Sequence, residues 1–160
     1  MKGWHNMTVF THYLIVFLIS MVPVVELRGA IPIGYGNGLN IWIAALVSIV
    51  GNLIPVPFII IFIRKIFSLI RKIAPKFDGL VTKLEKRAEN KSDVVKKYSF
   101  WGLFLLVAIP LPGTGAWTGA LVAAMLDMRL KRAMPAITLG VIAAAVVVAF
   151  ITCGADALIF

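Results

Sequence analysis

The amino-acid sequence predicts an all-α membrane protein. We expect two inverted repeats, each a re-entrant helical hairpin followed by a transmembrane helix, with amphipathic cytoplasmic helices between them. Three observations support this prediction: the apolar composition, two long apolar segments without charges, and two apolar segments interrupted at their centres. Of the 160 residues, 61% are hydrophobic and 14% are charged, whereas a soluble domain has about 45–50% apolar and about 25% charged residues. The composition therefore excludes an ordinary soluble domain.

Two segments are long and apolar enough to cross a membrane as single helices, residues 40–63 and residues 133–153. A spanning helix needs about 20 apolar residues, and neither segment contains a charged side chain. The first segment contains Pro55 and Pro57, which lack the backbone N–H and clash with the preceding helical turn. We therefore expect a kink near its middle.

Two further apolar segments are broken at their centres, which predicts helices that enter the membrane and turn back. Residues 99–125 are interrupted at residues 110–115, where two prolines and two glycines occur and break a helix. Each flanking arm is about 16 Å long as a helix, which reaches the middle of a hydrocarbon core about 30 Å thick. Residues 13–36 follow the same plan, with the break at residues 26–29.

Basic residues gather in two places, which sets the expected topology. Eleven of the sixteen lysines and arginines lie in residues 64–97, and three more lie in residues 129–132. The positive-inside rule places such clusters in cytoplasmic loops, and both share one side only if residues 99–125 turn back. Both termini then lie outside a multi-pass protein of the cytoplasmic (inner) membrane. Because the clusters adjoin apolar segments, membrane lipids are the expected partner and nucleic acid is not.

The two halves of the chain resemble each other, which predicts one membrane domain, residues 1–160, made of two repeats. Residues 16–23 align with residues 103–110 at an offset of 87, so that both breaks fall in register. Repeat one covers residues 12–63 and repeat two covers residues 99–155. One repeat starts outside and the other inside, an inversion typical of transporters whose binding site lies where the breaks meet.

The linker between the repeats, residues 64–98, places apolar residues at helical spacing on both sides of Pro75. This pattern predicts amphipathic helices on the cytoplasmic membrane surface. A soluble helical hairpin packed on itself is the alternative, and the sequence leaves both open.

Glu26 and Arg28 are the first candidate site residues, because apolar sequence flanks them and they fall at membrane depth. Ionisable groups are costly there unless they are paired or hydrated, so they mark functional sites. A carboxyl group in low-dielectric surroundings also suits proton coupling. The alternative is that Glu26 and Arg28 pair with each other or with backbone and hold the tip together, and the two roles are compatible.

The second tip offers backbone groups in place of charges. Gly113 and Gly115 allow close approach of a ligand or another segment, and Thr114 can cap the following helix. Two helix N-termini near the membrane midplane, together with Arg28, predict an anion-binding site. Close packing of the two tips is the alternative role for the glycines.

The complete candidate set for substrate and proton binding combines the two tips with the residues beside them. It consists of Glu26, Arg28, Gly29, Asn52, Pro110, Pro112, Gly113, Thr114, Gly115 and Trp117. Asn52 can bond a carbonyl that the prolines leave free or line a cavity, and Trp117 can contact a ligand or pack in the core.

The groups expected of an enzyme or a metal site are missing from the sequence. It contains one cysteine, Cys153, and two histidines, His5 and His12. No nucleophile–base pair and no metal-ligand spacing is recognisable. We therefore expect no enzymatic activity, no metal and no cofactor.

Two motifs resemble those of the small multidrug export protein family of bacteria and archaea. They are Glu-Leu-Arg-Gly-Ala-Ile-Pro at residues 26–32 and Pro-Leu-Pro-Gly-Thr-Gly-Ala-Trp at residues 110–117, and the resemblance covers nearly the whole chain. That family is distantly similar to the DedA family, whose members have paired re-entrant hairpins and are linked to moving polyprenyl-phosphate carriers or phospholipids. The resemblance implies lipid translocation, although the second tip lacks the charged residues typical of the DedA pattern.

These observations predict a small membrane transporter of an anionic lipid-phosphate carrier or a related amphipathic substrate, with protons as the candidate coupling ion. Export of lipophilic cations, with Glu26 as the counter-charge, is one alternative. A lipid-handling or assembly factor that transports nothing is another. Because four elements form a thin wall around a substrate, we expect a homo-oligomer, with a dimer favoured.

Overall fold

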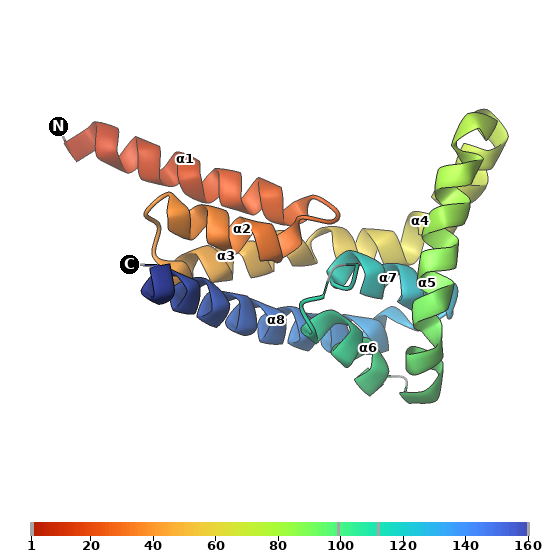
Figure 1. Cartoon of the computed structure of the whole chain (residues 1–160). Helices are drawn as coiled ribbons and strands as arrows, with labels where there is room; N and C mark the ends of the chain where they lie inside the picture. Colours follow the sequence, from red (N-terminus) through yellow and green to blue (C-terminus); the bar gives the residue numbers. More distant parts are fainter. Residues whose placement is uncertain (1, 99, 112, 160) are drawn as a thin grey trace.

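The computed structural model describes the backbone of residues 2–98, 100–111 and 113–159, and the side chains of residues 9–90, 100–111 and 113–155. Within these residues the chain forms helices and no strands, which confirms the all-α class. In chain order the elements are α1 (Lys2–Met21), α2 (Glu26–Gly36), α3 (Ile41–Leu53), α4 (Pro55–Ile73), the 3₁₀ helix η1 (Pro75–Phe77), α5 (Asp78–Tyr98), α6 (Phe100–Ala108), α7 (Ala116–Met125) and α8 (Leu130–Ile159) (Figure 1).

Two helical segments of the described chain are long and apolar enough to cross a membrane: Ile41–Ile73, formed by α3 and α4, and Leu130–Ala155 in α8. Only 28% of the most apolar window of the first and 44% of that of the second is buried within the chain. Large apolar side chains such as Leu46, Phe58 and Phe150 are exposed on their outer faces. The core helix of a soluble protein would have these faces covered, so the surface fits contact with lipid.

The first of these segments bends where the prolines were expected to act. α3 ends at Leu53, and α4 begins with Pro55 in its first turn, where the missing N–H costs least. The helix then continues to Ile73, beyond the predicted end at residue 63. Its apolar stripe keeps helical spacing until Pro75, so residues 64–73 extend the spanning helix and form no separate surface helix.

Two helix–loop–helix units bring their loops together near the middle of the long helices. α1 and α2 run antiparallel around residues 22–25, and residues 109–115 join α6 to α7 (Figure 1). α7 lies at the centre of the bundle, because eight of its ten residues are buried. The units have the predicted form, and their re-entry into a membrane stays a prediction.

Glycine permits close packing at corresponding places in the two halves. A Cβ atom added to Gly51 in α3 would lie 2.6 Å from the carbonyl oxygen of Phe17 in α1. One added to Gly140 in α8 would lie 3.0 Å from the carbonyl oxygen of Phe104 in α6. Phe17 and Phe104 are aligned in the two predicted repeats, so the contacts support a shared plan. The repeats, their inversion and the dimer stay predictions.

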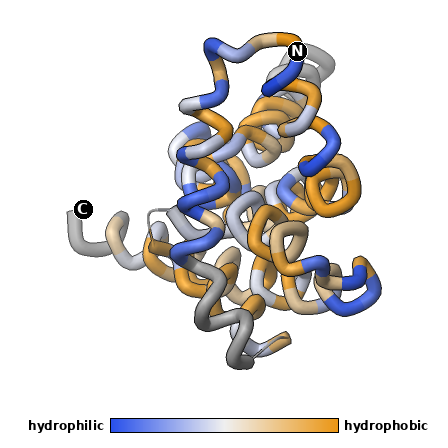
Figure 2. The backbone as a smooth tube through the Cα atoms, turned by 90° about the vertical axis from the view of Figure 1, so that its right-hand side faces the viewer, coloured by the Kyte–Doolittle hydropathy of each residue, from blue (hydrophilic) through white to orange (hydrophobic). Residues whose placement is uncertain are grey.

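α5 crosses one end of the bundle, at a steep angle to the long helices (Figure 1). Its apolar side, which includes the buried Val81 and Ala88, packs against α6 and α7. Viewed from this end, α5 exposes hydrophilic residues in front of a mainly hydrophobic bundle (Figure 2). In the described residues, the linker therefore covers the bundle and does not pack on itself as a separate hairpin.

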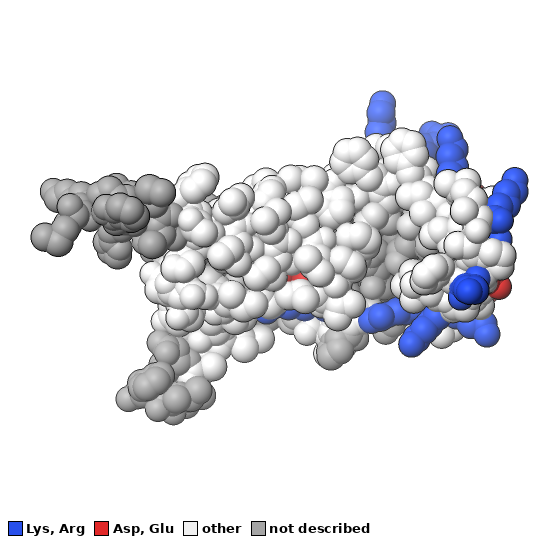
Figure 3. Space-filling view, turned by 90° about the horizontal axis from the view of Figure 1, so that it is seen from above, with Lys and Arg blue, Asp and Glu red and all other residues white. Residues whose placement is uncertain are grey.

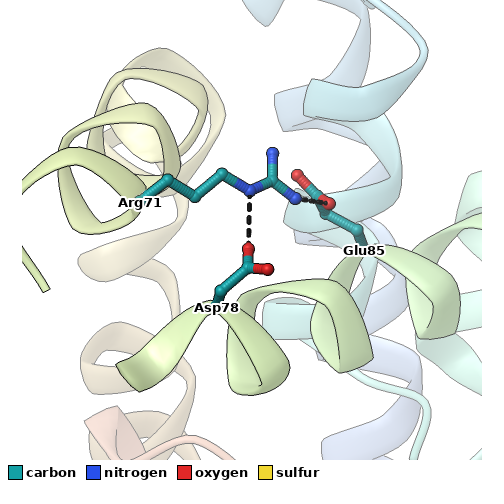
Figure 4. A network of polar contacts seen from close by, with 3 residues as sticks. All are labelled: Arg71, Asp78 and Glu85. Atoms are coloured by element: carbon teal, nitrogen blue, oxygen red, sulfur yellow. Dashed lines mark hydrogen bonds and ion pairs between the residues drawn. The ribbon is translucent and has the colours of Figure 1, made fainter. Parts of the chain in front are cut away.

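Arg71 at the end of α4 fixes the start of α5. Its Nε donates a hydrogen bond of 3.0 Å to Asp78, and a terminal nitrogen donates one of 2.6 Å to Glu85 (Figure 4). Exposed ion pairs of this kind are each worth at most about 1 kcal/mol. They set the position of α5 more than they stabilise the fold.

The two basic clusters lie at the same end of the molecule. Arg64 in α4 pairs with Asp127, which lies in the link between α7 and α8 beside the second cluster. Lys and Arg side chains gather at this end in the space-filling view, and the rest of the described surface on this face is almost free of charge (Figure 3). The outer ends of α1 and α8 lie at the opposite end (Figure 1). The re-entrant interpretation requires this arrangement, and the side of the membrane that each end faces stays a prediction.

Single cysteines test the orientation on a Cys153→Ala background. Lys76→Cys and Lys131→Cys should react with a membrane-impermeant thiol reagent only from the cytoplasmic side, because each lies in a basic cluster. Gly36→Cys, at the end of α2 beside the uncharged link to α3, should react only from outside. Reaction of Lys131→Cys from outside would contradict the topology.

Candidate functional site

Glu26 begins α2 and reaches across to the N-terminus of α7. Its side chain is buried, with 4% of the residue exposed, and its Oε1 accepts a hydrogen bond of 3.0 Å from the backbone N–H of Trp117. The first N–H groups of a helix have no partner within the helix and favour a negative charge. Gly115, which precedes α7, has no side chain to supply a cap. The carboxylate of the other loop takes that role.

Gly115 makes this contact sterically feasible. Its φ is +126°, a conformation that glycine adopts at little cost, and a Cβ atom here would collide with the Glu26 carboxylate. Gly113 also has a positive φ, +83°, and a Cβ atom there would collide with the guanidinium of Arg87. Close packing of the two tips, the alternative role for the glycines, is therefore present at Gly115, whereas Gly113 packs against α5.

Arg28, two residues after Glu26, binds the loop that follows α6. It donates hydrogen bonds to the carbonyl oxygens of Leu111, Thr114 (2.8 Å) and Ile109 (3.3 Å), and to the hydroxyl oxygen of Thr114 (2.9 Å). These acceptors belong to the loop that follows α6, which ends at Ala108, and the helix dipole favours a cation beyond a C-terminus. A guanidinium group has five N–H donors, so these contacts leave only the Nε–H of Arg28 without a partner among the described residues.

Trp117 in the second half of the chain forms a hydrogen bond with the first half. Its indole Nε1–H donates a hydrogen bond of 3.1 Å to the carbonyl oxygen of Met21, the last residue of α1. Each half of the chain therefore satisfies backbone groups at the broken helix of the other. This is the backbone pairing that the sequence offered as one role for Glu26 and Arg28.

Asn52 in α3 lies beside Glu26 and Arg28. It has no exposed surface, and neither atom of its amide makes a hydrogen bond of ordinary geometry within the described chain. The gap that it shares with Glu26, Arg28 and Gly115 has no space for a water molecule. A buried unpaired polar group costs about 1–3 kcal/mol. Asn52 thus faces the Glu26 junction, and its predicted bond to a freed carbonyl is not observed.

A cavity of about 180 Å³ adjoins the two loops. Its described lining is mainly apolar: Pro23, Val24, Ile63, Leu84, Trp117 and Leu121. Its polar lining consists of Glu26, Arg87, Gly113, Thr114 and Thr118. Glu26 is the only member of these two sets that gains or loses a proton in the ordinary pH range, because arginine stays protonated. An apolar chamber with a few polar groups suits an amphipathic ligand.

The structure brings most of the predicted site residues to one place. Glu26, Gly113, Thr114 and Trp117 line the cavity, and Arg28, Asn52 and Gly115 line the closed gap beside Glu26. Gly29 and Pro110 belong to neither described lining, and Pro112 lies outside the described residues.

Arg87 is the lining residue that sequence reasoning missed. It lies on α5, one turn from Lys83 and next to Lys86. The three basic side chains look equivalent in the sequence, and only the packing of α5 on α7 brings one of them to the cavity. No group of three His, Cys, Asp or Glu residues in the described chain could hold a metal ion.

The family of the chain is shown by a match that begins at Glu26. A family model described as "Putative small multi-drug export protein" matches residues 26–147, which run from Glu26 at the start of α2 through the second loop and into α8. The chain belongs to this family. The family description names export and no enzyme, and a membrane protein agrees with the exposed apolar faces of the long helices. No curated protein and no solved structure matches the chain, and the distant similarity to the DedA family stays a prediction.

The contact between the loops predicts the effect of a single methyl group at Gly115. Gly115→Ala should lower the melting temperature strongly, because it adds both backbone strain and a clash with Glu26, together about 2 kcal/mol or more. Gly79→Ala is the matched control, since no atom lies within 4 Å of the added Cβ. Equal melting temperatures for the two variants in detergent would show that the loops do not meet at Gly115.

Proposed function

We propose that this protein exports amphipathic organic molecules across the cytoplasmic membrane in exchange for protons. One observation supports this function above the others: an apolar cavity between the two loops has Glu26 in its wall. The same carboxylate caps α7 and so holds the two halves together. A single group can therefore sense the substrate, carry the proton and control the junction.

The shape of the site supports access from one end only. The cavity extends to Leu84 and Arg87 of α5 at the basic end of the molecule. Beyond Glu26, the gap lined by Leu27, Asn52 and Val107 leaves no space for water. In the proposed mechanism this state is open to the cytoplasm, and the contacts of Glu26 and Arg28 with the second loop close the outer side.

Protonation of Glu26 is the step that opens the outer side. The ionised carboxylate interacts with the positive end of α7, an effect worth about 0.3–2 kcal/mol, and a neutral carboxyl group loses most of it. The charged groups nearest to Glu26 are Arg28 on its own helix and Arg87 across the cavity, and both stay cationic. The amide of Asn52 lies beside the carboxyl group, close enough to interact with it, and can form a full hydrogen bond with it once the cap is weakened.

The groups that the sequence predicts as the anion site are bound within the protein. The sequence placed that anion at Arg28 and at two helix N-termini. Four N–H groups of Arg28 are bound by the second loop, and Glu26 occupies the N-terminus of α7. In this state, neither group is free for a substrate. Lipophilic cations, the alternative, would use Glu26 as counter-charge, and a factor that transports nothing would show no flux.

Glu26→Gln tests the proton step, because glutamine keeps the shape and the hydrogen-bond acceptor but cannot carry a proton. In proteoliposomes with an imposed pH gradient, the parent should export amphipathic dyes and the variant should lose nearly all gradient-driven flux. Binding of the dye to the variant should change by no more than about threefold, within the spread of a neutral contact.

Glu85→Gln is the control for this measurement, since Glu85 has the same chemistry and lies outside the cavity on α5. It should export like the parent. Gradient-driven export by Glu26→Gln at the parental rate would reject the role of Glu26. Absence of flux by the parent for anionic, cationic and neutral dyes would favour the non-transporting factor.

A further inference from the structure

We infer that Arg87, with Lys83 and Lys86 on the same face of α5, binds the anionic head group of the exported molecule while its apolar part occupies the cavity. This assignment rests on the proposed export function and names its substrate class. The chemistry is that of a phosphate or carboxylate group on an alkyl tail.

Arg87 is the described residue that the apolar cavity and an open groove on α5 have in common. It lines the apolar cavity beside the loops and also an open groove on α5, which it shares with Gly79, Thr82, Lys83, Lys86 and Asn90. Its guanidinium lies directly over Gly113 in the second loop. A molecule that entered the cavity from the basic end would therefore pass this side chain.

Arg87 is exposed and has no hydrogen bond or ion pair with the described chain. Arg28, Arg64 and Arg71, by contrast, all bind acceptors within the protein. A free guanidinium at a cavity mouth offers a planar fork that matches carboxylate and phosphate oxygens. Lys83 and Lys86 add two positive charges, and the described lining of the groove contains no acidic side chain.

The polar and apolar groups are arranged in the order that an anionic amphiphile requires. Lys83, Lys86 and Arg87 are exposed, Glu26 is buried, and the cavity that Arg87 and Glu26 both line includes the apolar side chains Ile63, Leu84 and Leu121. A lipophilic cation would have to pass three positive charges before it reached Glu26. An anionic head group is held by the exposed charges while its apolar tail occupies the cavity.

Titration calorimetry in a neutral detergent tests the assignment with three probes: octyl phosphate, octyltrimethylammonium and inorganic phosphate. The parent should bind octyl phosphate more tightly than the cation. It should bind inorganic phosphate weakly, because that probe lacks a tail. Arg87→Gln should weaken octyl phosphate binding about tenfold, the effect of one lost charge-assisted contact. Arg87→Glu should reverse the preference between the two octyl probes.

Lys76→Glu is the matched control for Arg87→Glu. It makes the same change in net charge on an exposed residue of η1 that lines neither the cavity nor the groove, and it should bind octyl phosphate like the parent. Equal affinities of the parent, Arg87→Gln and Arg87→Glu for octyl phosphate would overturn the assignment. So would tight binding of inorganic phosphate alone, which would indicate a site for the free ion.

The outcomes separate this inference from the proposed function. If the Arg87 variants bind octyl phosphate normally while Glu26→Gln still abolishes gradient-driven flux, the head-group site is wrong and proton-coupled export stands. If Arg87 governs binding but the parent moves no substrate, the anion site stands and export is wrong.

Discussion

Two opposite charges on the first turn of α2 hold the two ends of the broken helix in the other half of the chain. Glu26 caps the N-terminus of α7, which carries partial positive charge, and Arg28 binds carbonyl oxygens of the loop that follows α6. The helix dipole favours an anion at the N-terminus of α7 and a cation beyond the C-terminus of α6. At the predicted membrane depth, a break would leave backbone groups without water, and each must find a partner. The spacing of one acidic and one basic residue supplies both partners from a single helix.

α7 is also held by the first half at its other end. Arg64 in α4 donates a hydrogen bond of 2.9 Å to the carbonyl oxygen of Met125, the last residue of α7, and pairs with Asp127 beyond it. An anion thus lies at the start of α7 and a cation at its end, both from the first half. Conformational change at the cavity therefore has to break or move these contacts, and Glu26 is the buried one that a proton can modify.

Much of this architecture could be predicted from local chemistry. Prolines and glycines mark the kink at Ile54 and the loop before α7, and long apolar segments mark the two spanning helices, because these effects act within a few residues. The end of the first spanning helix could not be placed at residue 63, since charges spaced off its apolar stripe do not stop a helix, and Pro75 does. Glu26 and Arg28 were recognised as exceptional because apolar sequence surrounds them. Their backbone partners lie more than 80 residues away and follow only from tertiary packing.

Arg87 is a residue whose position at the cavity could not be predicted from the sequence. Nothing in the sequence distinguishes it from Lys83 or Lys86, because its role depends on which face of α5 packs on α7. The positive-inside pattern explains why basic residues are present at this end. It does not indicate that one of them borders a cavity.

Hydrogen exchange at the start of α7 tests the central claim most directly. With Glu26→Ala, the backbone amides of residues 116–118 should exchange faster than in the parent, because the N–H of Trp117 loses its acceptor and the local structure opens more easily. Glu85→Ala, which removes an acidic side chain from α5 without touching either loop, should leave these amides unchanged. Parental exchange at residues 116–118 in a folded Glu26→Ala variant would show that the carboxylate does not hold the two halves together.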